Sequence, residues 1–239
     1  MTKAHQIPQL PPKANRLLAA LPQTDYERLL PHLRPVVMPL GEVLYETGDT
    51  IHTVYFMTAG MISLVLTSNQ GINVEVGIVA REGLVGMKTL VSDSPALERA
   101  VVQISGSAYR MSAETLKEEF EHSSTLRSQI LRHTQAMFTQ AAQGSLCNRL
   151  HSIEERLCRW LLTVSDRVGS DDLELTQEFL AQMLGSRRSG VTVTAGTLRA
   201  AGLIDYSRGR IKILDRQGLS ETSCECYAVI RDEFEQLFH

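Results

Sequence analysis

The segment that most constrains this chain is residues 176–200, which predicts two short helices joined by a tight turn. Thr176 can cap the first helix, and an apolar stripe follows at helical spacing, made of Phe179, Leu180, Met183 and Leu184. Gly185 permits the positive φ that ends a helix, and Ser186 can cap the second one. This layout is typical of a helix-turn-helix, whose second helix enters the DNA major groove.

Arg187 and Arg188 open the second predicted helix. Cations at a helix N-terminus oppose the helix dipole by roughly 0.3–1 kcal/mol each when exposed, so a purely structural helix gains nothing from them. A helix aimed at phosphates and guanine edges does gain from them. The pair therefore favours DNA binding, and a solvated basic end on an ordinary helix pair is the alternative.

A basic hairpin is predicted directly after this helix pair. Residues 203–206 and 211–214 have strand character, and the turn between them holds Arg208, Gly209 and Arg210. The chain has a net charge of only −3, but residues 176–216 carry seven basic and three acidic side chains, a net of +4. A local basic patch is the electrostatic footprint of a nucleic-acid site, so we interpret the hairpin as a wing that grips the DNA backbone. A plain surface hairpin is the alternative.

Length and hydropathy limit the number of domains and the compartment of the protein. A chain of 239 residues is long enough to form two domains. No apolar run approaches the ~18 residues of a membrane span, and three early prolines interrupt the place of a signal-peptide core. We therefore expect a cytoplasmic protein with no membrane partner, and four cysteines without a disulfide framework fit a reducing compartment.

The region from Val36 to about Met111 has the pattern of β structure. Residues 54–57 and 61–66 are strand-like runs on either side of Thr58-Ala59-Gly60, and apolar residues alternate with others over 72–78. Glycines recur at turn-like intervals. Many short strands with glycine turns predict a small barrel or roll.

From about Ser123 the sequence predicts a long helix with two apolar stripes, followed by a helix over about 151–168. One stripe holds Leu126, Ile130, Met137 and Ala141, and the second holds Leu131, Phe138 and Ala142. Such a helix must bury both sides, one against its own roll and the other against a partner chain. We predict a homodimer interface made of Leu126, Ile130, His133, Met137 and Ala141. A monomer with a doubly buried helix is the alternative.

A β roll, a long helix and a winged helix-turn-helix, in this order, resemble the Crp–Fnr family of bacterial transcription regulators. The resemblance covers about residues 15–214 and is carried by 39–49, 54–60, 175–185 and 201–204. It implies an α+β fold. An antiparallel, cyclic-nucleotide-binding-like roll (1–122) would precede a dimerisation helix (123–145) and a winged helix-turn-helix domain (146–239).

The resemblance also implies how DNA would be read. Each recognition helix of a symmetric dimer would enter one of two major grooves, ~34 Å apart, of a roughly palindromic double-stranded site. Arg188 matches a guanine-reading arginine, whereas Ser189 and Val193 replace a base-reading glutamate and an arginine of family members, so the target sequence should differ. The predicted DNA contacts are Thr176, Gln177, Arg187, Arg188, Ser189, Thr192, Val193, Arg199, Arg208 and Arg210. RNA polymerase would be a further partner, although no motif identifies that surface.

Cyclic-nucleotide binders of this family hold the ribose with a Gly-Glu pair and the phosphate with a downstream arginine. Gly86 and Arg99 fit this pattern, but Met87 does not, because a thioether is a weak acceptor. Losing one hydrogen bond to a charged group costs about 1.5–3 kcal/mol, or roughly ten- to a hundred-fold in affinity. We therefore predict an effector pocket at these residues that does not respond to ordinary cyclic AMP. A structural ion pair of Arg99 with Glu98 or Glu82 is the alternative, and the effector stays open.

The cysteines bear on a redox mechanism. Oxygen-sensing members of the family carry an N-terminal cysteine cluster, and here no cysteine precedes Cys147. Cys224 and Cys226 are close enough to bind a metal or react, yet a single C-x-C lacks two further ligands. We predict no metal and no cofactor, and expect buried free cysteines. A redox-responsive regulator acting through Cys224 and Cys226 is the alternative.

Two other classes of function have less support. The roll region holds one histidine, His52, and the chain has neither a P-loop nor a Gly-x-Ser-x-Gly motif, so we predict no catalytic residues and no enzyme. A ligand-responsive regulatory module of a kinase or channel would not require a recognition helix and a wing. The sequence thus favours a DNA-binding transcription regulator.

Overall fold

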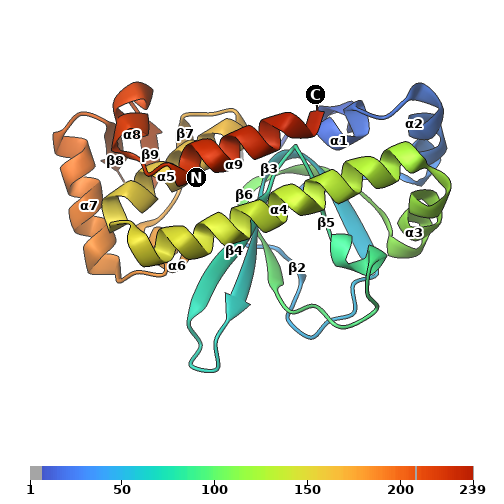
Figure 1. Cartoon of the computed structure of the whole chain (residues 1–239), viewed down its shortest axis with the longest axis horizontal. Coiled ribbons are helices and arrows are strands. Elements are labelled where there is room, and N and C mark those ends of the chain that lie inside the picture. Colours follow the sequence, from blue (N-terminus) through green and yellow to red (C-terminus); the bar gives the residue numbers. More distant parts are fainter. Residues whose placement is uncertain (1–6, 208, 239) are drawn as a thin grey trace, which may run out of the picture. The chain divides into compact units, whose positions relative to one another are not determined.

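A computed structural model describes residues 7–207 and 209–238, which form two compact units (Figure 1). The first unit contains residues 7–64, 78–135 and 237–238, and the second contains 65–77 and 136–236. One long helix, α4 (Ser124–Leu150), contributes to both units. No helix among the described residues is long and apolar enough to cross a lipid bilayer.

An antiparallel sheet dominates the β-rich region, as the sequence predicts. Its strand order is β1-β6-β3-β4, with β2 on β6 and β5 on β3. The strands are β1 (Arg34–Met38), β2 (Val43–Tyr45), β3 (Thr53–Thr67), β4 (Asn73–Val79), β5 (Leu84–Val85) and β6 (Arg99–Ser112). The short helices are η1 (Pro12–Ala14), α1 (Arg16–Ala19), α2 (Gln23–Leu29), η2 (Leu30–His32) and η3 (Met87–Leu90). Apolar side chains of α1, β3 and the following α3 (Ala113–His122) share one buried core.

Strands β3 and β6 run straight through the glycines that the sequence suggested as turns. A Cβ atom at Gly60 would lie 2.4 Å from the carbonyl oxygen of Ile104, and one at Gly106 would lie 2.1 Å from that of Ala59. Gly60 also has a φ of +77°, which L side chains rarely adopt. These glycines therefore let two backbones approach each other closely, and the expected break between residues 57 and 61 is wrong.

The N-terminal half of α4 packs inside the first unit. Leu126 and Ile130 are at most 2% exposed and belong to the core that contains Leu17 and Phe120. His133 is 1% exposed. The prediction that Leu126, Ile130 and His133 face a partner chain is therefore wrong, because this stripe is already buried in its own chain.

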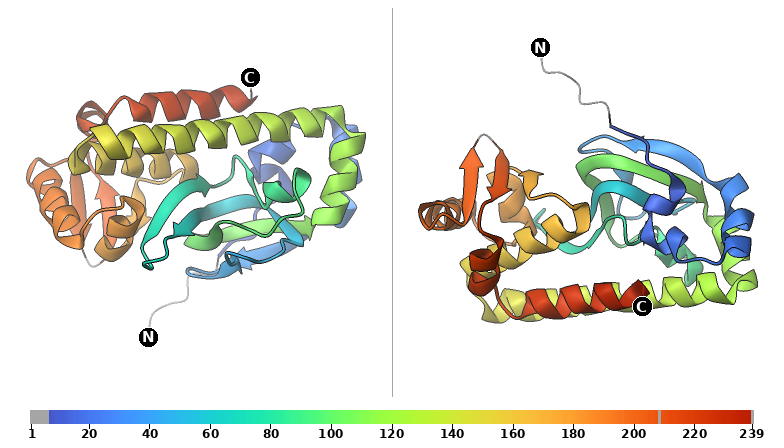
Figure 2. Two further views of the ribbon diagram at one scale, coloured as in Figure 1. Left: turned by 60° about the horizontal axis from the view of Figure 1, so that its bottom comes forward. Right: turned by 90° about the horizontal axis from the view of Figure 1, so that it is seen from above.

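The second unit is built around α5 (Ile153–Val168), which confirms the helix predicted at 151–168. Ser152 and Glu155 form a capping box at its start, and Gly169 ends it in the left-handed conformation. A small antiparallel sheet follows in the order β7-β9-β8 (Figure 2). The other elements are β7 (Asp172–Glu174), α6 (Gln177–Met183), α7 (Arg188–Ala200), β8 (Ile204–Ser207), β9 (Arg210–Ile213), α8 (Arg216–Thr222), α9 (Cys226–Glu235) and η4 (Gln236–Phe238).

Candidate nucleic-acid interface

The α6–α7 pair has the predicted helix-turn-helix layout. The Thr176 hydroxyl accepts a hydrogen bond from the backbone N–H of Phe179 at 3.2 Å, which caps α6. Gly185 has a φ of +53° and turns the chain after α6. The expected cap of the second helix is wrong: Arg187, not Ser186, is the N-cap of α7, and its side chain makes no capping bond.

Two contacts hold α6 and the turn after it on α5. The Arg156 guanidinium donates a hydrogen bond to the carbonyl of Leu184, the last residue before the turn, and burial lowers the pKa of Arg156. The rings of Trp160 and Phe179 meet edge to face with centroids 5.8 Å apart. Helix α6 is therefore anchored at its start by an aromatic pair and at its end, where the turn begins, by a charge-assisted hydrogen bond.

Helix α7 has one buried and one exposed face. Val191, Ala195 and Leu198 are at most 2% exposed and pack inward, as the sequence predicts. On the other side, Val193 is 71% exposed and the Arg188 side chain is 68% exposed. Single apolar residues are common on protein surfaces, so it is the combination of Val193 with the exposed arginine and hydroxyl side chains of this face that matches a DNA-reading surface.

The exposed face and first turn of α7 present most of the predicted DNA contacts. Arg187, Ser189 and Thr192 are exposed, and Arg188 lies 3.8 Å from the carboxylate of Glu178. The Thr192 hydroxyl donates to the side-chain oxygen of half-buried Gln177 at 2.8 Å, which links α7 to α6. Exposed ion pairs of this kind hold little free energy, so the Arg188 guanidinium can exchange Glu178 for another anion.

The wing is a real hairpin, β8–β9, and it is extended by β7, which the sequence did not predict. Gly209 has a φ of +79°, and its carbonyl accepts a hydrogen bond from the backbone N–H of Leu175 at 2.8 Å. Arg210 pairs with Asp172 at 2.6 Å, and Arg199 pairs with Asp205 at 3.2 Å.

Arg208 lies outside the described residues. The described part of the predicted interface thus comes from α6, the turn, α7 and β9.

The predicted effector residues lie in the first unit. Gly86 has a φ of +95°, and the Met87 sulfur lies 3.0 Å from Nδ1 of His133. The Arg99 Nε lies 3.4 Å from a carboxylate oxygen of Glu46, so its ion-pair partner is not one of those expected. A cavity of about 480 Å³ in the same unit is lined by Thr50–His52, Lys88–Thr89, Ser92–Ser94, Ala113–Glu114 and Lys117, and none of the three predicted residues lines it.

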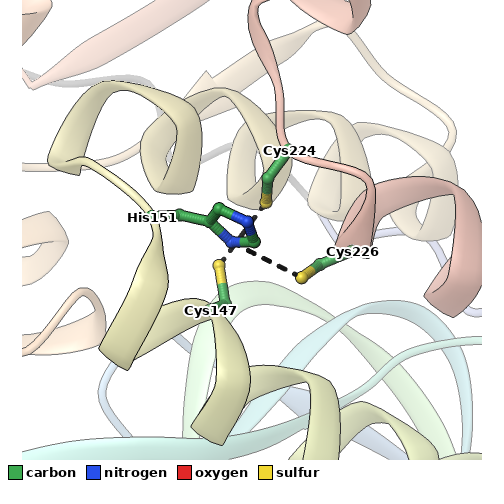
Figure 3. Close-up of side chains that lie close together, drawn as sticks. All are labelled: Cys147, His151, Cys224 and Cys226. Atoms are coloured by element: carbon green, nitrogen blue, oxygen red, sulfur yellow. Dashed lines mark hydrogen bonds between the residues drawn. The ribbon is translucent and has the colours of Figure 1, made fainter.

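A cluster of three cysteines and one histidine forms in the second unit (Figure 3). Cys147 lies in the last turns of α4, His151 follows that helix, and Cys224 and Cys226 lie where α9 begins. The four sulfur and nitrogen ligand atoms all lie within 4.8 Å of one another. The expectation that Cys224 and Cys226 lack further ligands is therefore wrong.

The pKa values of the cysteine thiols in this unit differ from one another. A hydrogen bond with Cys224, aided by nearby Arg159, lowers the pKa of Cys147 to about 5, and burial raises that of Cys226 to about 11. Cys158 lies outside the cluster, and burial raises its pKa to about 12. The sequence could not reveal the cluster, because Cys147 and Cys224 are separated by 77 positions along the chain.

Comparison with known proteins agrees with this architecture. Residues 35–123 match the family model of the cyclic nucleotide-binding domain, and residues 155–222 match that of the Crp-like helix-turn-helix domain. The chain is 26% identical over 220 residues to the global nitrogen regulator of Synechocystis sp., a match that covers 87% of this chain and 96% of that protein. It is 27% identical over 191 residues to the global nitrogen regulator of Synechococcus elongatus, covering 76% of this chain and 86% of that protein.

Solved structures show the same fold. FixK2 from Bradyrhizobium japonicum superposes with a TM-score of 0.70 at 16% identity, covering 80% of this chain and 98% of its own. A regulator of the crp/fnr family from Eubacterium rectale superposes with a TM-score of 0.69 at 17% identity, and the match covers 88% of this chain and 98% of that protein's chain.

A sensor-like roll followed by a winged helix-turn-helix defines a DNA-binding transcription regulator. The chain belongs to the Crp–Fnr family of such regulators, and the resemblance noted from its sequence is confirmed.

Proposed function

We propose that this regulator acts as a homodimer and inserts one α7 helix of each chain into successive major grooves of a roughly palindromic DNA site. Arg187, Arg188, Ser189, Thr192 and Val193 would face the base edges. Thr176, Gln177, Arg199 and Arg210, with Arg208 of the wing, would contact the phosphate backbone. RNA polymerase is the further partner that activation of transcription would require.

The observation that carries this proposal is the division of α7 into two faces. Its inner face is closed against the second unit, whereas Arg188 and Val193 are both more than two-thirds exposed. The turn before α7 is anchored by the buried Arg156, so the exposed face is held in a fixed orientation. A rigid, basic and partly apolar helix face can pair with guanine acceptors and thymine methyl groups at once.

The exposed stripe of α4 is the surface that we propose for dimerisation. Leu131 is 51% exposed and Phe138, seven positions later, is 68% exposed. Of the interface residues predicted from the sequence, half-buried Met137 and exposed Ala141 stay in this proposal. A seven-residue spacing of apolar side chains is the geometry that two helices need to pack along a common seam.

We further propose that ordinary cyclic AMP is not the effector. Met87 offers a sulfur where a ribose hydroxyl would need a carboxylate, and that sulfur already contacts Nδ1 of His133. Arg99 is engaged by Glu46. A nucleotide at this place would have to break both contacts and would gain only a weak acceptor in return.

Replacement of Arg188 by alanine tests the DNA-binding role. We expect a loss of about 1–3 kcal/mol on the specific site, because one bidentate contact to guanine disappears, and weaker base discrimination at that position. Binding to random DNA should fall much less. Fluorescence anisotropy with both DNAs over a salt series measures these losses, and wild-type affinity should fall steeply as salt rises, because phosphate contacts release counterions.

Arg28→Ala is the matched control for this experiment. Arg28 is also an exposed arginine paired with a carboxylate, Glu119, but it belongs to the first unit. Its loss should leave both affinities unchanged. Equal losses for Arg188→Ala on specific and random DNA would contradict the assignment.

A further inference from the structure

We propose that Cys147, His151, Cys224 and Cys226 bind one Zn²⁺ ion in a structural Cys₃His site. Three thiolates and one imidazole are a donor set that zinc prefers when all four positions are closed by protein. The ligands come from the end of α4 and from the segment that leads into α9, both in the second unit.

The spacing of the donor atoms fits a single tetrahedral ion. Zinc–sulfur bonds of about 2.3 Å and zinc–nitrogen bonds of about 2.1 Å separate neighbouring ligand atoms by about 3.6–3.8 Å. Here the Cys147 and Cys224 sulfurs are 3.5 Å apart, and the Cys226 sulfur lies 3.7 Å from Nδ1 of His151. Figure 3 shows the three sulfurs gathered around the imidazole ring of His151.

Local sequence explains why the four side chains converge. Cys147 lies in the last turn of α4 and His151 directly after that helix, four positions further on, so with helical spacing both project on the same side of the chain. The backbone N–H of His151 bonds to the carbonyl of Cys147 at 3.1 Å, which keeps the helical spacing through the last turn. On the other segment, Cys224 and Cys226 stand on either side of Glu225.

Glu225 supplies the outer hydrogen bond that metal-bound histidines require. Nε2 of His151 lies 3.2 Å from the Glu225 carboxylate, while Nδ1 of the same ring faces the thiols. A proton held on Nε2 by this carboxylate leaves the Nδ1 lone pair free for the metal. Glu225 is therefore a positioning residue for the site.

Charge around the cluster is also matched to a thiolate site. Three thiolates and a neutral imidazole around Zn²⁺ leave one net negative charge. Two arginines of α5, Arg156 and Arg159, interact with these cysteines, Arg159 most directly with Cys147. Cations in this position stabilise thiolates that burial alone would disfavour.

Other chemistries fit the geometry less well. An iron–sulfur cluster places several irons and sulfides between its ligands, so it spreads them further apart than one ion does. A disulfide between Cys147 and Cys224 would use two of the four donors and leave the convergence of Cys226 and His151 without a cause. The compact set of four donors favours one ion.

Zinc at this place would cross-link the α4–α5 junction to the segment that follows the wing. In a chain folded around such an ion, binding free energy adds directly to the stability of the linked segments. We therefore expect the metal to hold the second unit together where the long helix enters it.

The test is to measure bound metal in the full-length reduced protein by plasma mass spectrometry, with zinc supplied during expression. We expect one zinc per chain. Replacement of the metal by Co²⁺ should give a thiolate charge-transfer band and intense visible bands of a tetrahedral site. Cys226→Ser should lose most of the zinc, and Glu225→Gln should weaken zinc binding about tenfold against a competing chelator.

Cys158→Ala is the matched control, because Cys158 is equally buried but lies outside the cluster, and its zinc content should stay at one per chain. Where a ligand variant fails to fold, the Co²⁺ titration of the wild-type chain decides. Four reactive thiols without zinc or a cobalt spectrum would overturn the proposal. So would a reducible disulfide between Cys147 and Cys224, or several irons with inorganic sulfide.

Discussion

Two substitutions on one helix, Phe138→Glu and Ile130→Ala, separate dimerisation from folding. Phe138 is 68% exposed in the single chain, whereas Ile130 is 2% exposed in the core of the first unit. Both lie on α4, so they differ in the face they occupy and not in the element they belong to. We expect Phe138→Glu to break the dimer and Ile130→Ala to weaken the fold.

The sizes follow from the exposed areas. A phenylalanine that is 68% exposed offers about 140 Å² for burial, worth about 3.5 kcal/mol at about 25 cal/mol per Å². The symmetric dimer contains this residue twice, so it should lose about 3.5 kcal/mol if one ring is buried and about 7 kcal/mol if both are, or about 2.5 to 5 orders of magnitude in Kd. Ile130→Ala leaves a cavity in a packed core and should cost about 2–5 kcal/mol of unfolding free energy.

Sedimentation equilibrium over a range of concentrations measures the dimer, and urea denaturation measures the fold. Phe138→Glu should raise the dissociation constant of the dimer. It should leave the unfolding free energy of the monomer within about 0.5 kcal/mol of wild type. A dimer of unchanged affinity after Phe138→Glu would refute the assignment of this stripe to the interface.

Three further predictions concern local packing and the effector. Gly196→Ala, in the middle of α7 with nothing within 4 Å of the added carbon, should raise the unfolding free energy by about 1 kcal/mol in a urea titration. Gly106→Ala should lower the unfolding free energy by about 1–3 kcal/mol or prevent folding, because the added carbon would lie 2.1 Å from the carbonyl oxygen of Ala59. An unchanged unfolding free energy would disprove the close approach of the two strands. Calorimetry with cyclic AMP should show no tight binding at Gly86, Met87 and Arg99, and submicromolar affinity would overturn that prediction.

Local patterns predicted the helix-turn-helix well, because its determinants are short-range. The cap at Thr176, the positive φ at Gly185 and the inner stripe of α7 are each decided by residues a few positions apart. Only the N-cap of α7 differs, which is Arg187 instead of Ser186. Signals of this length can be recognised in a single chain.

Tertiary placement is what the sequence could not supply. Gly60 and Gly106 look like turn residues, and only their mutual contact shows that they sit within continuous strands. The two apolar stripes of α4 are equally plausible as a buried face until the core with Leu126 and Ile130 is known. The pairing of Cys147 and His151 with Cys224 and Cys226 depends on chain segments far apart in sequence, so no local motif announces it.

Methylation interference on the specific DNA site tests the central claim most directly, because dimethyl sulfate marks guanine N7 in the major groove and adenine N3 in the minor groove. If the exposed face of α7 reads base edges, methylated N7 should block binding in two patches about one helical turn apart, related by two-fold symmetry. Arg188→Ala should abolish the effect at one guanine in each patch. Interference confined to adenine N3, or a single patch without a symmetric partner, would contradict the account.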